Sequence, residues 1–130
     1  MALNFSKASR EAEEKRDFVE NCAAFDTSLS KLESVLREEN VVLEAHQSID
    51  HGPFTVRKNH ILRELMVLHK GDKTGAVVAS MTNRLKDIRQ LIDFNHRLLR
   101  AQIEAMSEIT NVLTRAAIAD GEDGTYSRKM

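Results

Sequence analysis

The most constraining feature of the sequence is a long apolar repeat in its C-terminal half. Between residues 78 and 116, apolar or amide side chains recur at alternating steps of three and four: Met81, Leu85, Ile88, Ile92, Asn95, Leu99, Gln102, Met106, Ile109 and Leu113. Such steps place side chains on one face of an α-helix, where they pack against another helix. The repeat therefore predicts one long packed helix, which we expect to end near Ala119, before the segment DGEDG.

A second apolar row lies one residue behind the first. It consists of Leu91, Phe94, Leu98, Ala101, Ala105 and Val112. With this row, the helix is apolar over a wider arc than one partner helix covers, so a second element or another protein must lie against it. Two polar members of the first row, Asn95 and Gln102, have two interpretations: they fix the register of helix packing, or their amides contact a bound segment.

A similar repeat starts at Phe18 and predicts an earlier long helix. Its members are Phe18, Cys22, Phe25, Leu29, Leu32, Leu36, Glu39, Leu43 and His46. The helix should stop near residues 48–50, because Pro53 in the motif HGPF disfavours helix in the residue before it. We expect Glu39 to lie at a solvent-facing end or beside a basic residue of a neighbouring helix. Residues 1–16 are expected to form a frayed helical start or a mobile arm.

A short apolar cluster predicts a middle helix at residues 56–69, which the glycine-containing segment KGDKTG at residues 70–75 would end. Its apolar face consists of Ile61, Leu62, Leu65, Met66 and Leu68. At ~1.5 Å per residue, the three helices would measure roughly 45, 20 and 65 Å. These lengths predict an all-α fold, an antiparallel helical bundle or coiled-coil hairpin of two long helices with a short middle helix.

Charge supports pairing of the two long helices. Residues 11–47 contain ten acidic and four basic side chains, whereas residues 73–118 contain seven basic and four acidic ones. Exposed pairs contribute only about 0.2 to 1 kcal/mol each, so they set register more than stability. We expect one helical domain over residues 1–120, followed by a flexible tail at residues 121–130.

Composition excludes several classes of function. The chain has 130 residues and a net charge of −1, without the cluster of basic residues that nucleic-acid binding needs. Cys22 is the only cysteine, so no internal disulfide is expected, and a cytoplasmic location is the default. We expect no membrane insertion, because no apolar run is long enough to span a bilayer, and no secretory signal.

Catalytic and metal sites are not expected either. The five histidines include no pair at helical spacing, no HExxH motif and no second thiol, so neither a metal nor a cofactor is predicted. His69-Lys70-Gly71 is the nearest approach to a histidine phosphotransfer domain, although in such domains the lysine and glycine follow the histidine by about one helical turn. We predict a protein that is not an enzyme and keep phosphotransfer as a less favoured alternative.

Two segments and the order of the elements form a recognisable pattern. The segment LIDFNHRLLRAQIEAMSEI has Asn95 ahead of Leu98 and Leu99, and the tail DGTYSRKM carries Tyr126, the chain's only tyrosine. This pattern resembles the FlgN-type flagellar export chaperones, mainly over residues 78–130. The resemblance implies a cytoplasmic chaperone that binds the hook-associated junction proteins between flagellar hook and filament. It would deliver them to the type III export gate.

The resemblance also implies which residues make contacts. The cargo would be held by the long C-terminal helix through Leu91, Phe94, Asn95, Leu98, Ala101, Gln102, Ala105 and Val112. Tyr126 would dock on an export gate component. The competing interpretation is a homodimeric coiled-coil module, structural or adaptor, which uses the same apolar row. A homodimer in the absence of cargo also stays open.

Overall fold

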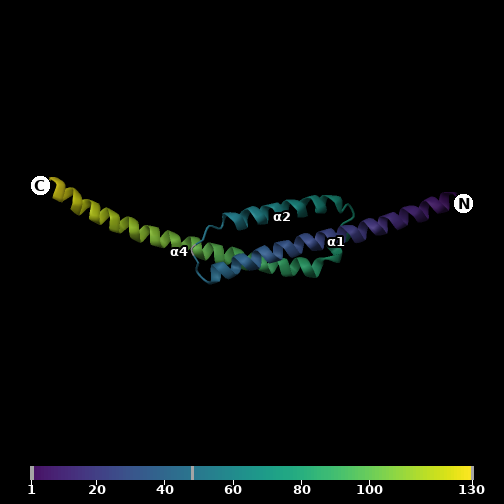
Figure 1. The fold of residues 1–130 in the computed structure, drawn as a ribbon, viewed down its shortest axis with the longest axis horizontal. Helices are drawn as coiled ribbons and strands as arrows, with labels where there is room; N and C mark the ends of the chain where they lie inside the picture. The colour runs from purple at the N-terminus through teal and green to yellow at the C-terminus, as the bar shows by residue number, and fades with distance from the viewer. Residues whose placement is uncertain (1, 48, 130) are drawn as a thin grey trace. The chain divides into compact units, whose positions relative to one another are not determined.

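The computed structural model describes the backbone of residues 2–47 and 49–129, and the side chains of residues 6–47 and 49–121. It contains four helices, α1 (Ala2–Glu44), α2 (Gly52–Gly71), α3 (Ala76–Ser80) and α4 (Thr82–Lys129), and no strand within the described residues (Figure 1). The predicted all-α bundle is confirmed. The chain forms two compact units, Met1–Asn95 and His96–Met130, and each is described by itself.

The core of the first unit follows the repeat in α1. Its buried apolar side chains come mainly from this helix, with one residue each from α2, α3 and α4: Phe25, Leu29, Leu32, Val35, Leu36, Ile61, Val77 and Ile88. The predicted row is confirmed between residues 25 and 43, because Phe25, Leu29, Leu32, Leu36, Glu39 and Leu43 are all buried. Residues 6–21 are helical and exposed, so α1 extends well beyond its packed part.

Helix α2 is longer than the predicted one. It starts at Gly52 and contains 20 residues, with Pro53 in its first turn. A proline at this place loses no helical hydrogen bond, because the first backbone N–H groups of a helix have no partner within it. The carboxylate of Asp50 accepts a hydrogen bond from the Gly52 N–H at 2.9 Å. The HGPF motif therefore begins α2, where the sequence predicted only a stop.

The predicted long C-terminal helix is interrupted near its start. Met81 separates α3 from α4 with non-helical dihedral angles. Ahead of the break, the Asp72 carboxylate accepts hydrogen bonds from the N–H groups of Val77 and Val78 at 3.1 and 3.0 Å. Gly75 has φ +73°, which glycine adopts without steric cost. The expectation of one unbroken helix from residue 78 is wrong, because this capped turn forms a separate short helix.

Helices α1 and α2 run in opposite directions. Near one end of the pair, the Arg57 guanidinium contacts the Glu38 carboxylate at 2.6 Å. Near the other end, the Ser28 hydroxyl donates to Glu64 at 3.3 Å. Residue numbers rise along one helix as they fall along the other, which defines an antiparallel pair.

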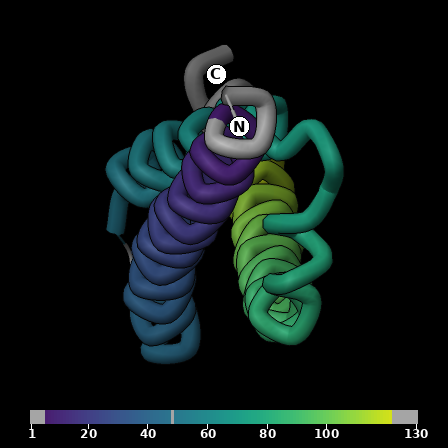
Figure 2. Tube along the Cα trace, turned by 90° about the vertical axis from the view of Figure 1, so that its right-hand side faces the viewer, coloured from purple at the N-terminus to yellow at the C-terminus, as the bar shows by residue number. Residues whose placement is uncertain are grey.

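Helices α1 and α4 run in the same direction within the first unit. The Cys22 thiol lies 3.5 Å from the hydroxyl of Ser80, just before α4, and the Asn95 amide lies 2.9 Å from Asn40. The predicted antiparallel pairing of the two long helices is therefore wrong. At ~1.5 Å per residue α2 is about 30 Å long, enough to return the chain along α1, so α4 starts beside Cys22. In Figures 1 and 2, α1 lies between α2 and the first turns of α4.

The second unit consists of the remaining part of α4. The predicted end of this helix at Ala119 is wrong, because Asp120 and Gly121 are also helical and the helix is bounded by Thr82–Lys129. The side chain of Tyr126, the predicted export-gate contact, lies outside the described residues. Within the described part of this unit, only Leu98, Leu99 and Gln102 are partly buried.

Candidate functional site

A buried polar cluster joins three helices around Glu39, whose side chain is fully buried. The Lys58 ammonium donates to one carboxylate oxygen at 2.7 Å, and the Asn95 amide donates to the same oxygen at 2.8 Å. Nδ1 of His51 lies 3.0 Å from the other oxygen. Of the two positions predicted for Glu39, the one beside a basic residue of a neighbouring helix is confirmed, since Lys58 belongs to α2. The alternative, a solvent-facing end, is wrong, because the side chain is buried.

Asn95 serves the interior of the bundle. Its side chain is 1% exposed. Besides the bond to Glu39, its Nδ2 donates to the Asn40 side chain at 2.9 Å, and its Oδ1 accepts from Lys58 at 3.3 Å. Both polar ends of the amide are therefore engaged within the first unit. This corrects the assignment of Asn95 to a cargo-binding face, because the side chain presents no open hydrogen-bonding group to a bound segment.

The cluster keeps a charged carboxylate in the core. Burial by itself would raise the pKa of Glu39, but hydrogen bonds from Lys58, Asn95 and His51 outweigh it, and the pKa lies below the ordinary value. The ionised form is thus the one that the packing favours. Glu39 belongs to α1, Lys58 to α2 and Asn95 to α4, and His51 directly precedes α2. The cluster therefore fixes how the three helices align.

The described residues offer no metal site. No group of three or more His, Cys, Asp or Glu side chains among them is arranged to hold an ion. Nε2 of His51 is buried and has no hydrogen-bond partner among the side chains that the structure describes. The other ring nitrogen faces a carboxylate that already accepts from Lys58 and Asn95. A search of the same residues for a helix long and apolar enough to cross a bilayer also found none.

The first two members of the second apolar row lie at a small cleft in the first unit. Leu91 and Phe94 are partly buried and line a space of about 310 Å³ together with Glu33, Arg37 and Arg84. Leu91 also packs against the core. Arg84 forms an ion pair with Glu33 across this cleft. The α1 side of the cleft is thus ionic, and these two apolar side chains are shared between core and surface.

The other predicted cargo residues belong to the second unit. Leu98 and Gln102 are partly buried, whereas Ala101, Ala105 and Val112 are exposed, the valine at 62%. Of the three exposed side chains, the two alanines are small and only Val112 is larger. The second row therefore supplies little exposed apolar area on this part of α4.

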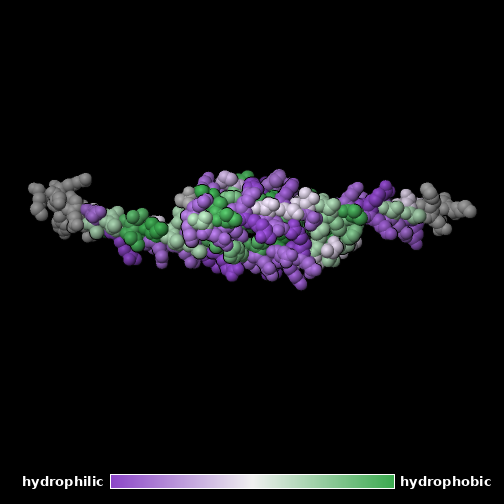
Figure 3. All heavy atoms as spheres, turned by 60° about the horizontal axis from the view of Figure 1, so that its bottom comes forward, coloured by the Kyte–Doolittle hydropathy of each residue, from purple (hydrophilic) through white to green (hydrophobic). Residues whose placement is uncertain are grey.

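Larger apolar side chains of the first row are exposed on the same part of α4. Ile103, which lies beside this row, and its members Met106, Ile109 and Leu113 are 66%, 59%, 58% and 63% exposed. We name these four residues the α4 apolar face. In Figure 3, hydrophobic atoms gather on the stretch of α4 next to the grey C-terminal atoms. Sequence reasoning assigned this row to packing on the first helix and therefore missed it as a free surface.

One signal could have identified the α4 apolar face. The repeat in α1 ends at residues 43–46, and α1 itself ends at Glu44, four residues after Asn40. Asn40 is the partner of Asn95, whereas the repeat in α4 continues to Leu113. If α1 runs parallel to α4, it continues for only about one more turn beyond Asn40, so it is too short to pack along the rest of the α4 repeat. This difference in length can be recognised only after the direction of the helices is known.

Charged side chains avoid the α4 apolar face. Arg100, Glu104, Glu108 and Arg115 are spaced by four, four and seven residues, which places them together on the opposite side of the helix. This part of α4 is therefore amphipathic, with an uncharged side about three turns long.

Comparisons with protein-family models, with curated proteins and with solved structures found no match for this chain.

Proposed function

We propose that this protein is a non-enzymatic export chaperone that holds an amphipathic segment of a partner protein against the α4 apolar face. The observation that carries the proposal is the row of four large apolar side chains, each more than half exposed. A contiguous apolar row with a charged opposite side is typical of a surface that binds an amphipathic helix.

The energetics suit a carrier that must release its load. Ile103 and Leu113 are ten residues apart, or about 15 Å along the helix, which corresponds to three turns of a bound helix. Fully burying one large aliphatic side chain contributes about 1.5 to 3 kcal/mol. A partner segment that is disordered when free must be ordered on binding, and this cost lowers the net affinity. Moderate affinity allows both capture and release.

The resemblance to FlgN-type chaperones supports a specific cargo and destination. We propose that the bound segments belong to flagellar hook-associated junction proteins, and that the complex goes to a component of the type III export gate. Of the predicted cargo residues, Gln102, Ala105 and Val112 are three or four positions from Met106 or Ile109, and Leu98 and Ala101 precede Gln102 and Ala105 by one turn. Asn95 does not take part, since its amide is used inside the bundle.

The test is calorimetric titration of the chain with the terminal segments of a junction protein. Replacing Met106 and Ile109 with glutamate should lower the affinity by about a hundredfold or more, because two charges would enter an apolar interface. Asn111→Glu is the matched control, because it adds a charge on the opposite side of the same helix. An unchanged affinity in the double variant would refute the proposal, and circular dichroism would verify that each variant is helical.

A second candidate function is a homodimeric structural or adaptor module. It is favoured by the uncharged character of the α4 apolar face, because two copies of one apolar surface can pack without charge repulsion. Sedimentation separates the two candidates. A monomer that forms a one-to-one complex with a partner segment supports the chaperone. An obligate dimer that dissociates in the Met106→Glu, Ile109→Glu variant supports the structural module.

A further inference from the structure

Helix α2 is apolar over more of its circumference than its neighbours cover. Ile61 is its only buried residue within the described part of the chain, whereas Leu62, Met66 and Val67 are 43%, 61% and 69% exposed. A helix that is apolar on several sides is normally covered on several sides. The exposed side chains of α2 therefore indicate a place where another element packs.

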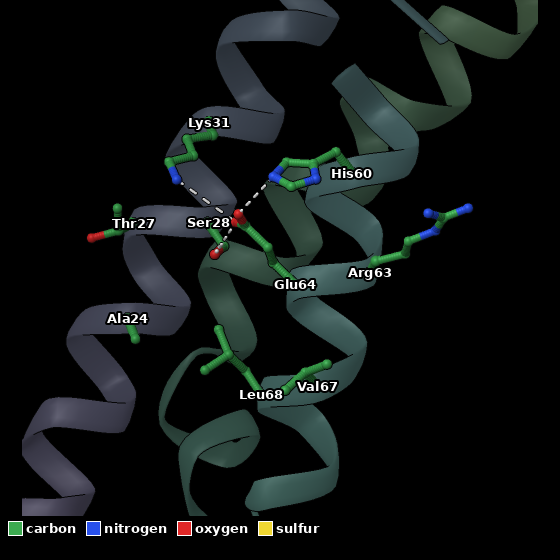
Figure 4. Close-up of a pocket in the computed structure, with 9 residues that line it drawn as sticks. All are labelled: Ala24, Thr27, Ser28, Lys31, His60, Arg63, Glu64, Val67 and Leu68. Atoms are coloured by element: carbon green, nitrogen blue, oxygen red, sulfur yellow. Dashed lines mark hydrogen bonds and ion pairs between the residues drawn. The ribbon is translucent and has the colours of Figure 1, made fainter. Parts of the chain in front are cut away.

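One groove beside α2 holds a carboxylate that is already matched within the chain. It lies between α1 and α2 and has a volume of about 640 Å³. Figure 4 shows Glu64 at its centre, in contact with Ser28, Lys31 and His60. The single carboxylate is thus held by side chains of the same chain. Arg63 also lines this groove and has no ion-pair partner among the described side chains.

A second groove is mostly apolar. It has a volume of about 580 Å³ and lies between α2 and α4, with α1 beneath. Its apolar lining consists of Phe25, Leu29, Leu62, Leu65, Met66 and Leu85, and His69 and Lys70 line its end on α2. From Leu62 to Lys70 it follows α2 for eight residues, or about 12 Å, which equals a little over two turns of a bound helix. We name it the α2–α4 groove.

Two cations lie in or next to the α2–α4 groove. Lys70 lines its end, and Arg89 follows Leu85, which lines the α4 side, by one helical turn. Neither has an ion-pair partner among the residues whose side chains are described, whereas Arg57 and Lys58 of α2 are paired with Glu38 and Glu39. Free positive charge is therefore available beside this apolar groove.

We propose that the α2–α4 groove binds an amphipathic helix of a partner protein whose apolar stripe is flanked by acidic residues. The apolar walls would cover the stripe, and Lys70 and Arg89 would pair with carboxylates on its two sides. A groove between two raised helices fits a rod better than a flat bilayer surface. This site is separate from the α4 apolar face, and the proposal does not rest on the proposed function.

The test uses two designed helical peptides of about 16 residues that have the same leucine stripe and differ only in their flanks, glutamate in one and lysine in the other. Fluorescence anisotropy with the full chain should give the glutamate peptide an affinity at least about tenfold higher. Met66→Glu should weaken its binding by about tenfold or more. The double variant Lys70→Glu, Arg89→Glu should reverse the order of the two peptides.

Matched controls separate this site from the α4 apolar face. Met106→Glu should leave binding of the glutamate peptide unchanged, and all substituted positions here are exposed, so the fold is retained. The proposal is overturned if both peptides bind equally, or if Met106→Glu abolishes binding while Met66→Glu does not. Stronger binding to phosphatidylserine vesicles than to the peptide would assign the groove to a membrane surface. Self-association that is lost in Met66→Glu would assign it to a second copy of the chain.

Discussion

The amide of Asn95 donates a hydrogen bond of 2.8 Å to the carboxylate of Glu39, and both side chains are enclosed in the bundle. The two residues are 56 positions apart, so the bond ties the end of α1 to the part of α4 that closes the first unit. A buried polar contact of this kind adds little net stability when it is satisfied, but it penalises every register that leaves one partner alone.

The first prediction concerns this bond. Asn95→Ala should lower the free energy of unfolding by about 1 to 3 kcal/mol, because Glu39 and Asn40 each lose a buried donor. Urea denaturation followed by circular dichroism measures the change. Gln102→Ala, at the next polar position of the same row, is the control and should change stability by less than about 0.5 kcal/mol. Loss of cargo binding by a fully stable Asn95→Ala protein would contradict the interior role.

A second prediction compares two neighbouring cations of α2. Lys58→Met should destabilise the fold by about 3 to 5 kcal/mol, because it leaves the buried Glu39 carboxylate without its ammonium partner. Arg57→Met is the matched control, since its pair with Glu38 is about half exposed, and such pairs contribute about 0 to 1 kcal/mol. The combined variant Glu39→Gln, Lys58→Met should recover much of the loss. Equal effects of the two single substitutions would show that burial of Glu39 does not matter.

A third prediction follows from the lowered pKa of Glu39. The unfolded carboxyl has the ordinary pKa, 4.5, and the folded one a lower value, because the bonds from Lys58, Asn95 and His51 outweigh the opposing effect of burial. Between these two values the unfolded chain binds more protons, so stability rises with pH. The contribution of Glu39 is therefore complete above pH 4.5 and is lost as the pH falls through the folded pKa.

Comparison with Glu39→Gln isolates this contribution. The pKa of Glu33 is also lowered, by hydrogen bonds from Arg84 and Arg37. Glu33 therefore makes the stability of both proteins fall on acidification, with the same sign as Glu39. The variant should be less stable at neutral pH and should lose less stability on acidification below pH 4.5. Urea unfolding at a series of pH values measures both slopes. Parallel curves for the two proteins would exclude Glu39 as a source of the pH dependence.

The interior of the bundle was largely predictable, because three- and four-residue spacing indicates which face of a helix is buried. Phe25, Leu29 and Leu43 lie where the repeat places them, and so does Ile88 on α4. A base beside Glu39 was one of the two predicted positions, because a carboxylate inside an apolar row must either reach solvent or find a partner. Val35 and Asn40 were missed because they widen the buried face by one residue on either side of the row.

The direction of the long helices could not be predicted from the sequence. A spacing of three and four residues is the same when a helix is reversed, and an acidic helix matches a basic one in either direction. The decisive quantity was the length of α2, which depended on whether Pro53 ends one helix or begins the next. The break at Met81 was not predicted, because it depends on the Asp72 side chain, which caps α3 and lies several residues before the break.

The sequence predicted an apolar binding face on α4 but not which residues form it. The sequence indicates that α4 is apolar over a wide arc, yet periodicity does not say which part of that arc another helix covers. The parallel register leaves the first row exposed at Met106 and Ile109, whereas the second row contributes Leu91 and Phe94 to a cleft of the first unit. The proposed cargo face therefore lies on the first row, whereas the prediction from the sequence placed it on the second.

The fourth prediction concerns the tail, whose proposed task is docking on the export gate. A chain that lacks residues 121–130 should keep the helices of its remaining residues and its affinity for junction-protein segments, because the α4 apolar face ends at Leu113. It should bind a purified export gate component at least about tenfold more weakly, since an aromatic anchor and its flanking charges are lost. Tyr126→Ala in the full chain should reproduce most of this effect, and Thr125→Ala is its control. If the truncated chain loses cargo binding instead, the tail belongs to the cargo site and the gate contact must lie elsewhere.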